Sequence, residues 1–267
     1  RFLNEKRDTI TSYSSTTDRK KEPIKIRKEF YEDPQAKRPG VLRADSGANV
    51  FVWDLRHEDA EEFEKDAVMQ GSLAGPKVIP GKYFVQLLRN DTLLSEQSFE
   101  IYEYPKIKVA PEELMAQNHL ALQLRDTISA IHRAVKEIRK IRGSIESFMG
   151  GFADTIEAKP FKDAAKPILD SLKIVEDELV QTKIKAGEDA LRFPIRLNDK
   201  LAILYDYVKA GDARPTDQEY TVFEDLTHDV AGSLGMLRRL EETLVPKFNE
   251  LAEHSRKPVI ELTKKTH

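Results

Sequence analysis

The stretch FPIRLNDKLAILYDYVKAGDARPTDQEY, residues 193–220, decides how the second half of the chain folds. Four of its apolar residues recur at steps of four, three and four, which is the spacing of one buried helix face: Leu197, Leu201, Leu204 and Val208. Pro194 suits the first turn of this helix, where its missing N–H costs little. Gly211 is placed for a left-handed C-terminal cap. The stretch therefore predicts a capped amphipathic helix.

The polar residues of the same stretch raise the question of an active site. Asp199 suits the positive end of the helix dipole, and Thr216 with Glu219 predicts a capping box for the next helix. Structural roles therefore explain most of these residues better than catalysis does. If the chain has an exposed binding site, we expect it in the loops around Arg196, Asn198, Asp199, Asp212 and Arg214.

The flanking segments repeat the helical period. Pro111, followed by two glutamates, predicts the start of a helix of about 33 residues, about 50 Å long, that ends near the glycine pair at 150–151. Residues 161–179 carry an apolar seam at steps of four and three, and a further helix is predicted from about Asp217 to near Phe248. Four amphipathic helices with short connections predict an elongated antiparallel four-helix bundle over 105–267.

Residues 1–104 have the period of strands instead. The opening residues predict a hairpin with NEKRD, residues 4–8, as its turn. NVFVWDLR, residues 49–56, alternates apolar and polar positions, which predicts a half-buried strand. Residues 80–91 and 97–102 predict a strand, a turn at 89–91 and a returning strand. Several short strands at this spacing predict an N-terminal antiparallel Ig-like β-sandwich, and hence an α+β protein with two domains.

One residue and one segment of this β region invite a binding role. Trp53 is the only tryptophan, and we expect it in the core, with carbohydrate stacking as the weaker alternative. Residues 16–47 are charged and carry three prolines, so we expect a long or partly disordered loop. Its basic residues are suited to an acidic partner, but a solvated loop is the simpler interpretation.

Composition excludes several classes of protein. The formal net charge of the 267 residues is −3, so no overall basic field argues for nucleic acid. There is no apolar run of about 18 residues, so we expect no membrane span. The absence of cysteine excludes disulfides and a thiol nucleophile. Because the chain starts at Arg1 inside a predicted strand, we expect a fragment of a longer protein, with a tag-trimmed chain or a mature chain as alternatives.

Motifs that carry chemistry are missing. The six histidines show no HExxH pattern and no i, i+4 pair: His57, His119, His132, His228, His254 and His267. There is no nucleophile elbow, phosphate-binding loop or dinucleotide fingerprint, and GSLAG, residues 71–75, leads into a loop and not a helix. The acidic clusters at 61–64 and 176–178 fit solvated faces better than an acid/base pair. We therefore predict no metal, no cofactor and no catalytic residue.

Three motifs resemble a known family: NVFVWDLR at 49–56, GPKVIPGKYFVQL at 75–87 and, most of all, FPIRLNDKLAILYDYVKAGDARPTDQ at 193–218. Together they are similar to the C-terminal region of bacterial proteins built on sortilin-type, BNR-repeat β-propellers, often described as glycosyl hydrolases or sialidase-like. The resemblance covers roughly residues 1–250. The propeller repeats are absent here, and the link YEYPKIK, residues 102–108, departs from the Asp-Pro-Arg-like junction expected in the family.

The resemblance implies an Ig-like domain followed by a helical tail, in an exported protein of the periplasm or exterior. We therefore expect a non-catalytic accessory region that orients or oligomerises the propeller of its parent protein, or docks a protein partner. The alternative is a part of a sialidase-like glycoside hydrolase whose catalytic residues lie outside this chain. A third hypothesis, a docking module built on the helices, predicts an exposed apolar stripe along them.

Overall fold

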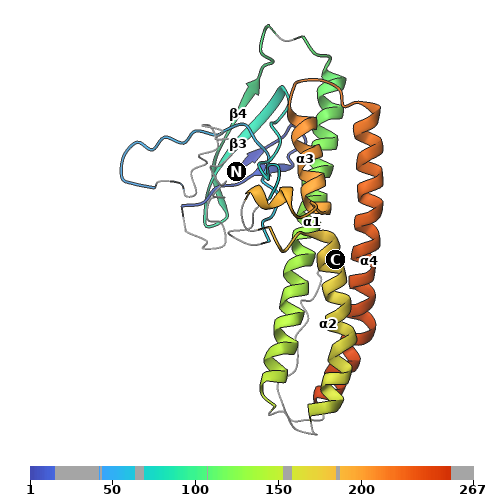
Figure 1. The fold of residues 1–267 in the computed structure, drawn as a ribbon. Helices are drawn as coiled ribbons and strands as arrows, with labels where there is room; N and C mark the ends of the chain where they lie inside the picture. Colours follow the sequence, from blue (N-terminus) through green and yellow to red (C-terminus); the bar gives the residue numbers. More distant parts are fainter. Residues whose placement is uncertain are drawn as a thin grey trace.

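The computed structural model describes residues 1–15, 42, 44–63, 69–106, 108–152, 158–184 and 187–253. Within these residues the chain is α+β, with one four-stranded antiparallel sheet beside four α-helices (Figure 1). None of the described helices is long and apolar enough to cross a membrane. The loop predicted at 16–47 lies mostly outside the described residues.

The sheet has the strand order β2-β1-β3-β4. The strands are β1 (Phe2–Leu3), β2 (Thr9–Thr11), β3 (Gly81–Arg89) and β4 (Thr92–Ile101), and every neighbouring pair is antiparallel. Both hairpins predicted from the sequence are therefore confirmed. Asn90 and Asp91, the two residues between β3 and β4, have φ values of 48° and 62°, as the right-handed twist of a two-residue hairpin favours.

The predicted β-sandwich is not seen in the described part of the chain, because residues 49–56 do not form a strand. Their alternation is real: Trp53 stacks on Phe2 with ring centroids 4.2 Å apart, whereas Val52 on the other side is 73% exposed. Backbone pairing is limited to one bridge between Arg56 and Lys77. Leu55, at φ 59°, turns the chain out of the extended conformation. The alternation of apolar and polar residues thus predicts which side chains face the sheet, but it does not predict that the segment pairs as a strand.

The four predicted helices are confirmed as α1 (Pro111–Gly150), α2 (Lys159–Leu179), α3 (Leu197–Lys209) and α4 (Asp217–Glu253). Pro111 lies in the first turn of α1, and Gly151 caps its end, so both predicted boundaries hold. These boundaries span 40 residues, so the predicted length of about 33 residues was too short. The seam residues predicted for α2 and for α3 are all buried, and both helices contribute to one continuous apolar core.

The two short helices follow one another along the same side of the two long ones (Figure 1). α2 packs against one half of α1 and α4, α3 packs against the other half, and α2 and α3 make few contacts with each other. At each level, therefore, three helices surround the core. The heptad-like period predicts helices with one buried face, but it does not tell whether two short helices lie side by side or end to end.

Two details of the stretch that opened the sequence analysis need correction. α3 begins at Leu197, so Pro194 lies before the helix, and the side chain of Asp199 accepts the backbone N–H of Arg196 at its start. Gly211 does not have a positive φ, because the helix ends on Ala210 in a right-handed conformation. The capping box is confirmed, since Thr216 and Glu219 exchange backbone-to-side-chain hydrogen bonds.

The sheet is joined to the helices by residues 57–77, which lie between its strands in sequence. The backbone of Glu61 receives a hydrogen bond from His132 and donates one to Ser129, both on α1. Asn118 of α1 donates to the carbonyl of Lys77 at 2.9 Å. Ala60, 3% exposed, belongs to the core of the helices. Part of the region predicted as the first domain thus packs inside the helical one.

Candidate functional site

The five residues predicted for a binding site lie at both ends of α3. Arg196 precedes the helix, and Asn198 and Asp199 are buried in its first turn. Asp212 and Arg214 are exposed in the loop beyond its other end. Thirteen helical residues span about 20 Å. The structure therefore brings together the first three residues and keeps them apart from the last two.

Residues 69–75, which we call the docked loop, pack against one face of α3. Asp199 accepts the backbone N–H of Gln70 at 2.9 Å, and Asp206 accepts that of Ser72 at 3.0 Å. The two aspartates are seven residues apart, so they lie two turns along one face of the helix. Carboxylates that bind backbone N–H groups form strong, directional hydrogen bonds. These two therefore fix the loop on the helix.

The far end of the docked loop is held by its carbonyl groups. The hydroxyl of Tyr205 donates to the carbonyl of Ala74 at 2.7 Å, and the ammonium of Lys209 reaches the same oxygen at 3.5 Å. Tyr205 is 0% exposed, so this bond satisfies a hydroxyl that has no access to water. Four side chains of α3 thus satisfy backbone groups of the docked loop.

Two glycines let the docked loop approach so closely. A Cβ atom at Gly71, whose φ is 91°, would lie 2.6 Å from the backbone carbon of Ala202 on α3. A Cβ at Gly75 would lie 2.2 Å from the carbonyl oxygen of His57. Neither position has room for a side chain. GSLAG, which has the composition of a phosphate-binding loop, is therefore a packing element in this protein.

Burial changes the ionisation of the groups that hold the loop. It raises the pKa of Asp199 to about 6, although the backbone N–H groups of Gln70 and Arg196 oppose the change. It also raises the pKa of Tyr205. Burial lowers the pKa of Lys209, against the attraction of Asp206 at 3.1 Å. All three shifts disfavour the charged form, as desolvation requires.

His132 on α1 is buried with 0% exposure. Because the carbonyl of Glu61 can only accept, Nδ1 carries the proton, and Nε2 is left with a lone pair and no hydrogen-bond partner. Burial lowers the pKa of His132 to about 4. Among the described residues no group of three or more His, Cys, Asp or Glu side chains is placed to hold a metal ion. His132 is thus a packed histidine.

Of the two acidic clusters, the one on α2 is only partly solvated. Glu176 is 4% exposed, and its carboxylate receives Arg139 at 2.7 Å and Arg142 at 2.5 Å, both from α1. Glu61 pairs with Arg133 at 2.6 Å, at the surface of α1. Glu64 lies outside the described residues. Glu61 and Glu176 are thus both paired with cationic side chains of α1.

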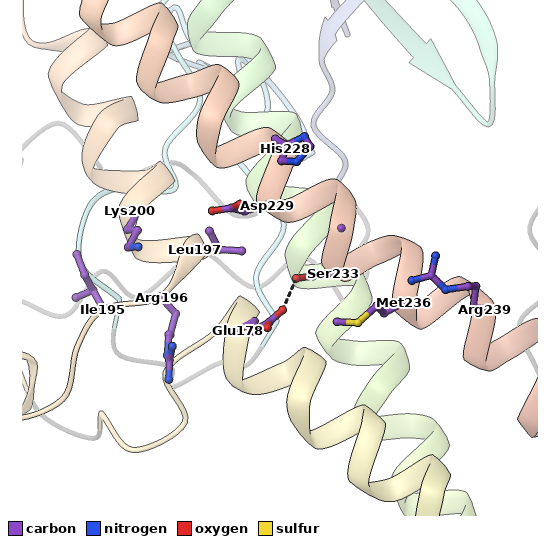
Figure 2. Close-up of a pocket in the computed structure, with 11 residues that line it drawn as sticks. Glu178, Ile195, Arg196, Leu197, Lys200, His228, Asp229, Ser233, Met236 and Arg239 are labelled. Carbon is purple, nitrogen blue, oxygen red and sulfur yellow. Dashed lines mark hydrogen bonds between the residues drawn. The ribbon is translucent and has the colours of Figure 1, made fainter.

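A hollow of about 580 Å³, which we call the break pocket, opens where α2 has ended and α3 has not yet begun. Its walls include Glu178 at the end of α2, Arg196 and Lys200 beside the start of α3, and Asp229, Ser233 and Arg239 on α4 (Figure 2). Ser233 donates to Glu178 at 2.8 Å and links α2 to α4 between these walls. Of the predicted site residues, Arg196 alone lines it.

The sequence analysis missed the α4 side of the break pocket. A signal was available, because Gly232 and Gly235 interrupt an otherwise regular helical pattern without ending it. A Cβ at Gly232 would meet nothing within 4 Å, so this glycine faces open space. Glycine inside a helix is costly, and its presence there leaves the wall of the pocket free of side chains.

Searches against models of protein families, against curated proteins and against solved structures find no match for this chain.

Proposed function

We propose that this chain is a non-catalytic accessory region that holds an attached domain in a fixed orientation. The observation that carries the proposal is the docked loop: the buried polar residues of α3 bind the backbone of residues 69–75 and so fasten the sheet region to the helices. α1 alone, at 40 residues, is about 60 Å long. The helices form an arm, and the sheet sits on its side near one end.

The resemblance supplies the attached domain. On that basis the sheet belongs to an Ig-like domain next to an exported β-propeller, in the periplasm or outside the cell. In this proposal the aromatic face of the sheet, where Phe2, Trp53 and Phe99 meet, corresponds to the inner face of the Ig-like domain. The helical arm then sets the direction in which the propeller faces and offers a surface for oligomerisation.

A docking module on the helices has less support. The large apolar side chains exposed on the four described α-helices fall one to each helix: Met115, Ile174, Tyr207 and Val222. A helix that docks a partner presents several such residues at helical spacing along one face. Single exposed apolar residues are normal on a protein surface.

Distance measurements between spin labels test the proposal. The chain has no cysteine, so two introduced cysteines are labelled specifically. Arg89→Cys on β3 and Ser147→Cys on α1 place one label on the sheet and one on the arm, and both positions are exposed. We expect one narrow distance distribution, because the docked loop fixes the two parts. The pair Ser147→Cys and Glu224→Cys, which lies on the helices alone, serves as control.

A broad distribution for the sheet–arm pair beside a narrow one for the control pair would overturn the proposal. The hydrolase alternative is tested separately, by incubating the same chain with a panel of glycosides. Our proposal expects no turnover by the chain alone. If the chain still hydrolyses a glycoside after contaminating enzymes have been removed, the alternative is established.

A further inference from the structure

The break pocket exists because the third helical position of the arm is interrupted. α2 ends at Leu179 and α3 begins at Leu197, whereas α4 continues past the break on the opposite side. Where a side chain of α4 would be expected to fill the space, the chain has Gly232. The volume of about 580 Å³ lies within the range of small-molecule sites.

Positive charge without a protein partner gathers around this pocket. The side chains of Arg196, Lys200 and Arg239 form no ion pair or hydrogen bond with any residue that the structure describes. Elsewhere in the described chain, Arg139 and Arg142 meet a carboxylate. The three cations of the pocket outnumber its two carboxylates, Glu178 and Asp229, so its lining carries a net positive charge.

One further feature of the α3 side favours an anion. The Nε atom of Arg196 is buried and has no hydrogen-bond acceptor within the described residues, and a buried donor left unpaired is unfavourable. The start of α3 itself is already occupied by a carboxylate, because Asp199 in its first turn accepts the backbone N–H of Arg196. An anion in the pocket would therefore be bound by side chains, and it would supply an acceptor to the guanidinium of Arg196.

The pocket also contains groups that accept hydrogen bonds. Asp229 on α4 and Glu178 on α2 line it, and Glu178 receives only the hydroxyl of Ser233. Figure 2 shows Asp229 and Glu178 between Arg196 and Lys200 on one side and Arg239 on the other. A ligand that is anionic throughout would meet these carboxylates unfavourably. A ligand with hydroxyl or amino groups next to its charge would donate to them.

From this arrangement we propose that the break pocket binds a small organic anion, with a phosphate or carboxylate held by Arg196 and Lys200, and with hydroxyl or amino groups directed at Asp229 and Glu178. Arg239, on the opposite wall of the pocket, faces the other end of the ligand. The assignment goes beyond the scaffold role and does not depend on it, since an arm with or without a ligand can orient a domain.

Isothermal titration of the full chain tests the site with four probes: glucose 6-phosphate, gluconate, glucose and inorganic phosphate. We expect the two hydroxylated anions to bind, glucose not to bind, and inorganic phosphate to bind more weakly than glucose 6-phosphate. Arg196→Gln and Arg239→Gln should each weaken binding about tenfold, as loss of a charge-assisted hydrogen bond does. Gly232→Met should abolish binding by filling the pocket.

Arg238→Gln is the matched control, because Arg238 neighbours Arg239 on α4 but does not line the pocket. Helical circular dichroism verifies that each variant is folded. The proposal is overturned if neither hydroxylated anion binds, if Gly232→Met binds as the wild type does, or if Arg238→Gln weakens binding as much as Arg239→Gln. Equal affinity for inorganic phosphate and glucose 6-phosphate would contradict the proposed hydrogen bonds from ligand hydroxyl groups to Asp229 and Glu178.

Discussion

α2 and α3 have the same apolar period in sequence but different surroundings in the fold. α2 buries seven of its 21 residues, six in the apolar seam and the paired Glu176, whereas α3 buries eight of its 13. The additional buried residues of α3 include Asn198, Asp199 and Tyr205, which lie outside its predicted seam. The docked loop covers this second face. Two helices with the same spacing of apolar residues can therefore differ: one packs only against the other helices, and the other also binds a loop on a second face.

The difference lies in the kind of interaction. The seam of α2 is held by burial of apolar surface, which has no preferred direction. The second face of α3 is held by directional hydrogen bonds: Asp199 and Asp206 accept backbone N–H groups, and Tyr205 donates to a backbone carbonyl. Removing part of the seam should destabilise the arm itself. Removing part of the second face should loosen the sheet from the arm.

The largest effect is expected in the seam of α2. Leu172 is 0% exposed, so Leu172→Ala should lower the free energy of unfolding by about 3–4 kcal/mol, because it removes apolar contacts and leaves a cavity. Urea denaturation followed by circular dichroism measures this loss. Ile174→Ala, on the same helix but 56% exposed, is the control and should change stability by less than about 1 kcal/mol. Similar losses for both would contradict the predicted seam.

The next largest effect is expected from a substitution that uncouples the unfolding of the sheet from that of the arm. Gly75→Ala places a Cβ against the carbonyl of His57, and we expect a cost of about 2–3 kcal/mol. Trp53 lies in the sheet cluster, so its fluorescence follows the sheet while circular dichroism follows the helices. The two transitions should coincide in the wild-type chain and come apart in the variant.

Gly143→Ala is the control for this glycine experiment, because a Cβ at that position in α1 meets nothing within 4 Å. It should stabilise the chain by up to about 1 kcal/mol through its better helix propensity. If the two transitions differ already in the wild type, the docked loop does not couple the parts.

Acid should weaken the attachment through His132. Its pKa is about 4 when folded, below the usual 6.5, so the unfolded chain takes up the proton more readily and stability falls as the pH drops from 6.5 towards 4. His57, with a pKa also lowered to about 4 by burial, acts in the same direction. Asp199 acts oppositely: its raised pKa of about 6 adds stability below that pH.

Urea midpoints at pH 7 and pH 4.5 test the balance of these groups. His132→Leu should reduce the acid-induced loss by roughly 2 kcal/mol. Asp199→Asn keeps the shape of the side chain but cannot take up a proton, so it should make the loss larger. An unchanged pH dependence in both variants would show that neither group controls it.

The smallest effect concerns one hydroxyl. Tyr205→Phe preserves the ring packing and removes only the hydrogen bond to Ala74, so we expect a loss of about 1–2 kcal/mol. Differential scanning calorimetry measures the change. Tyr207→Phe, two residues along α3 and 68% exposed, should leave the stability within about 0.5 kcal/mol of the wild type. A loss no larger than that of the control would mean that Lys209 or water satisfies the Ala74 carbonyl in the absence of the hydroxyl.

Much of the helical part follows from the sequence. Side chains recur every 3.6 residues on a helix, so the apolar seam residues of α2 and α3 were predicted correctly as buried. Two local signals marked helix starts. Pro111 has no backbone N–H to be satisfied in the first turn of α1, and Thr216 and Glu219 satisfy each other's backbone N–H groups at the start of α4. The hairpins formed for the same reason, since Asn90 and Asp91 accept positive φ values. Each of these features depends on residues a few positions apart.

Tertiary structure decided the rest. Residues 49–56 have the alternation of a strand, but a ladder needs a neighbouring strand, and the sequence of one segment does not contain it. The docked loop joins Gln70 to Asp199 and Ser72 to Asp206 across more than a hundred residues. The break pocket likewise needs α2 and α3 placed end to end against Gly232. The sequence by itself determined the local periods and caps; contacts between distant segments determined which faces those periods bury.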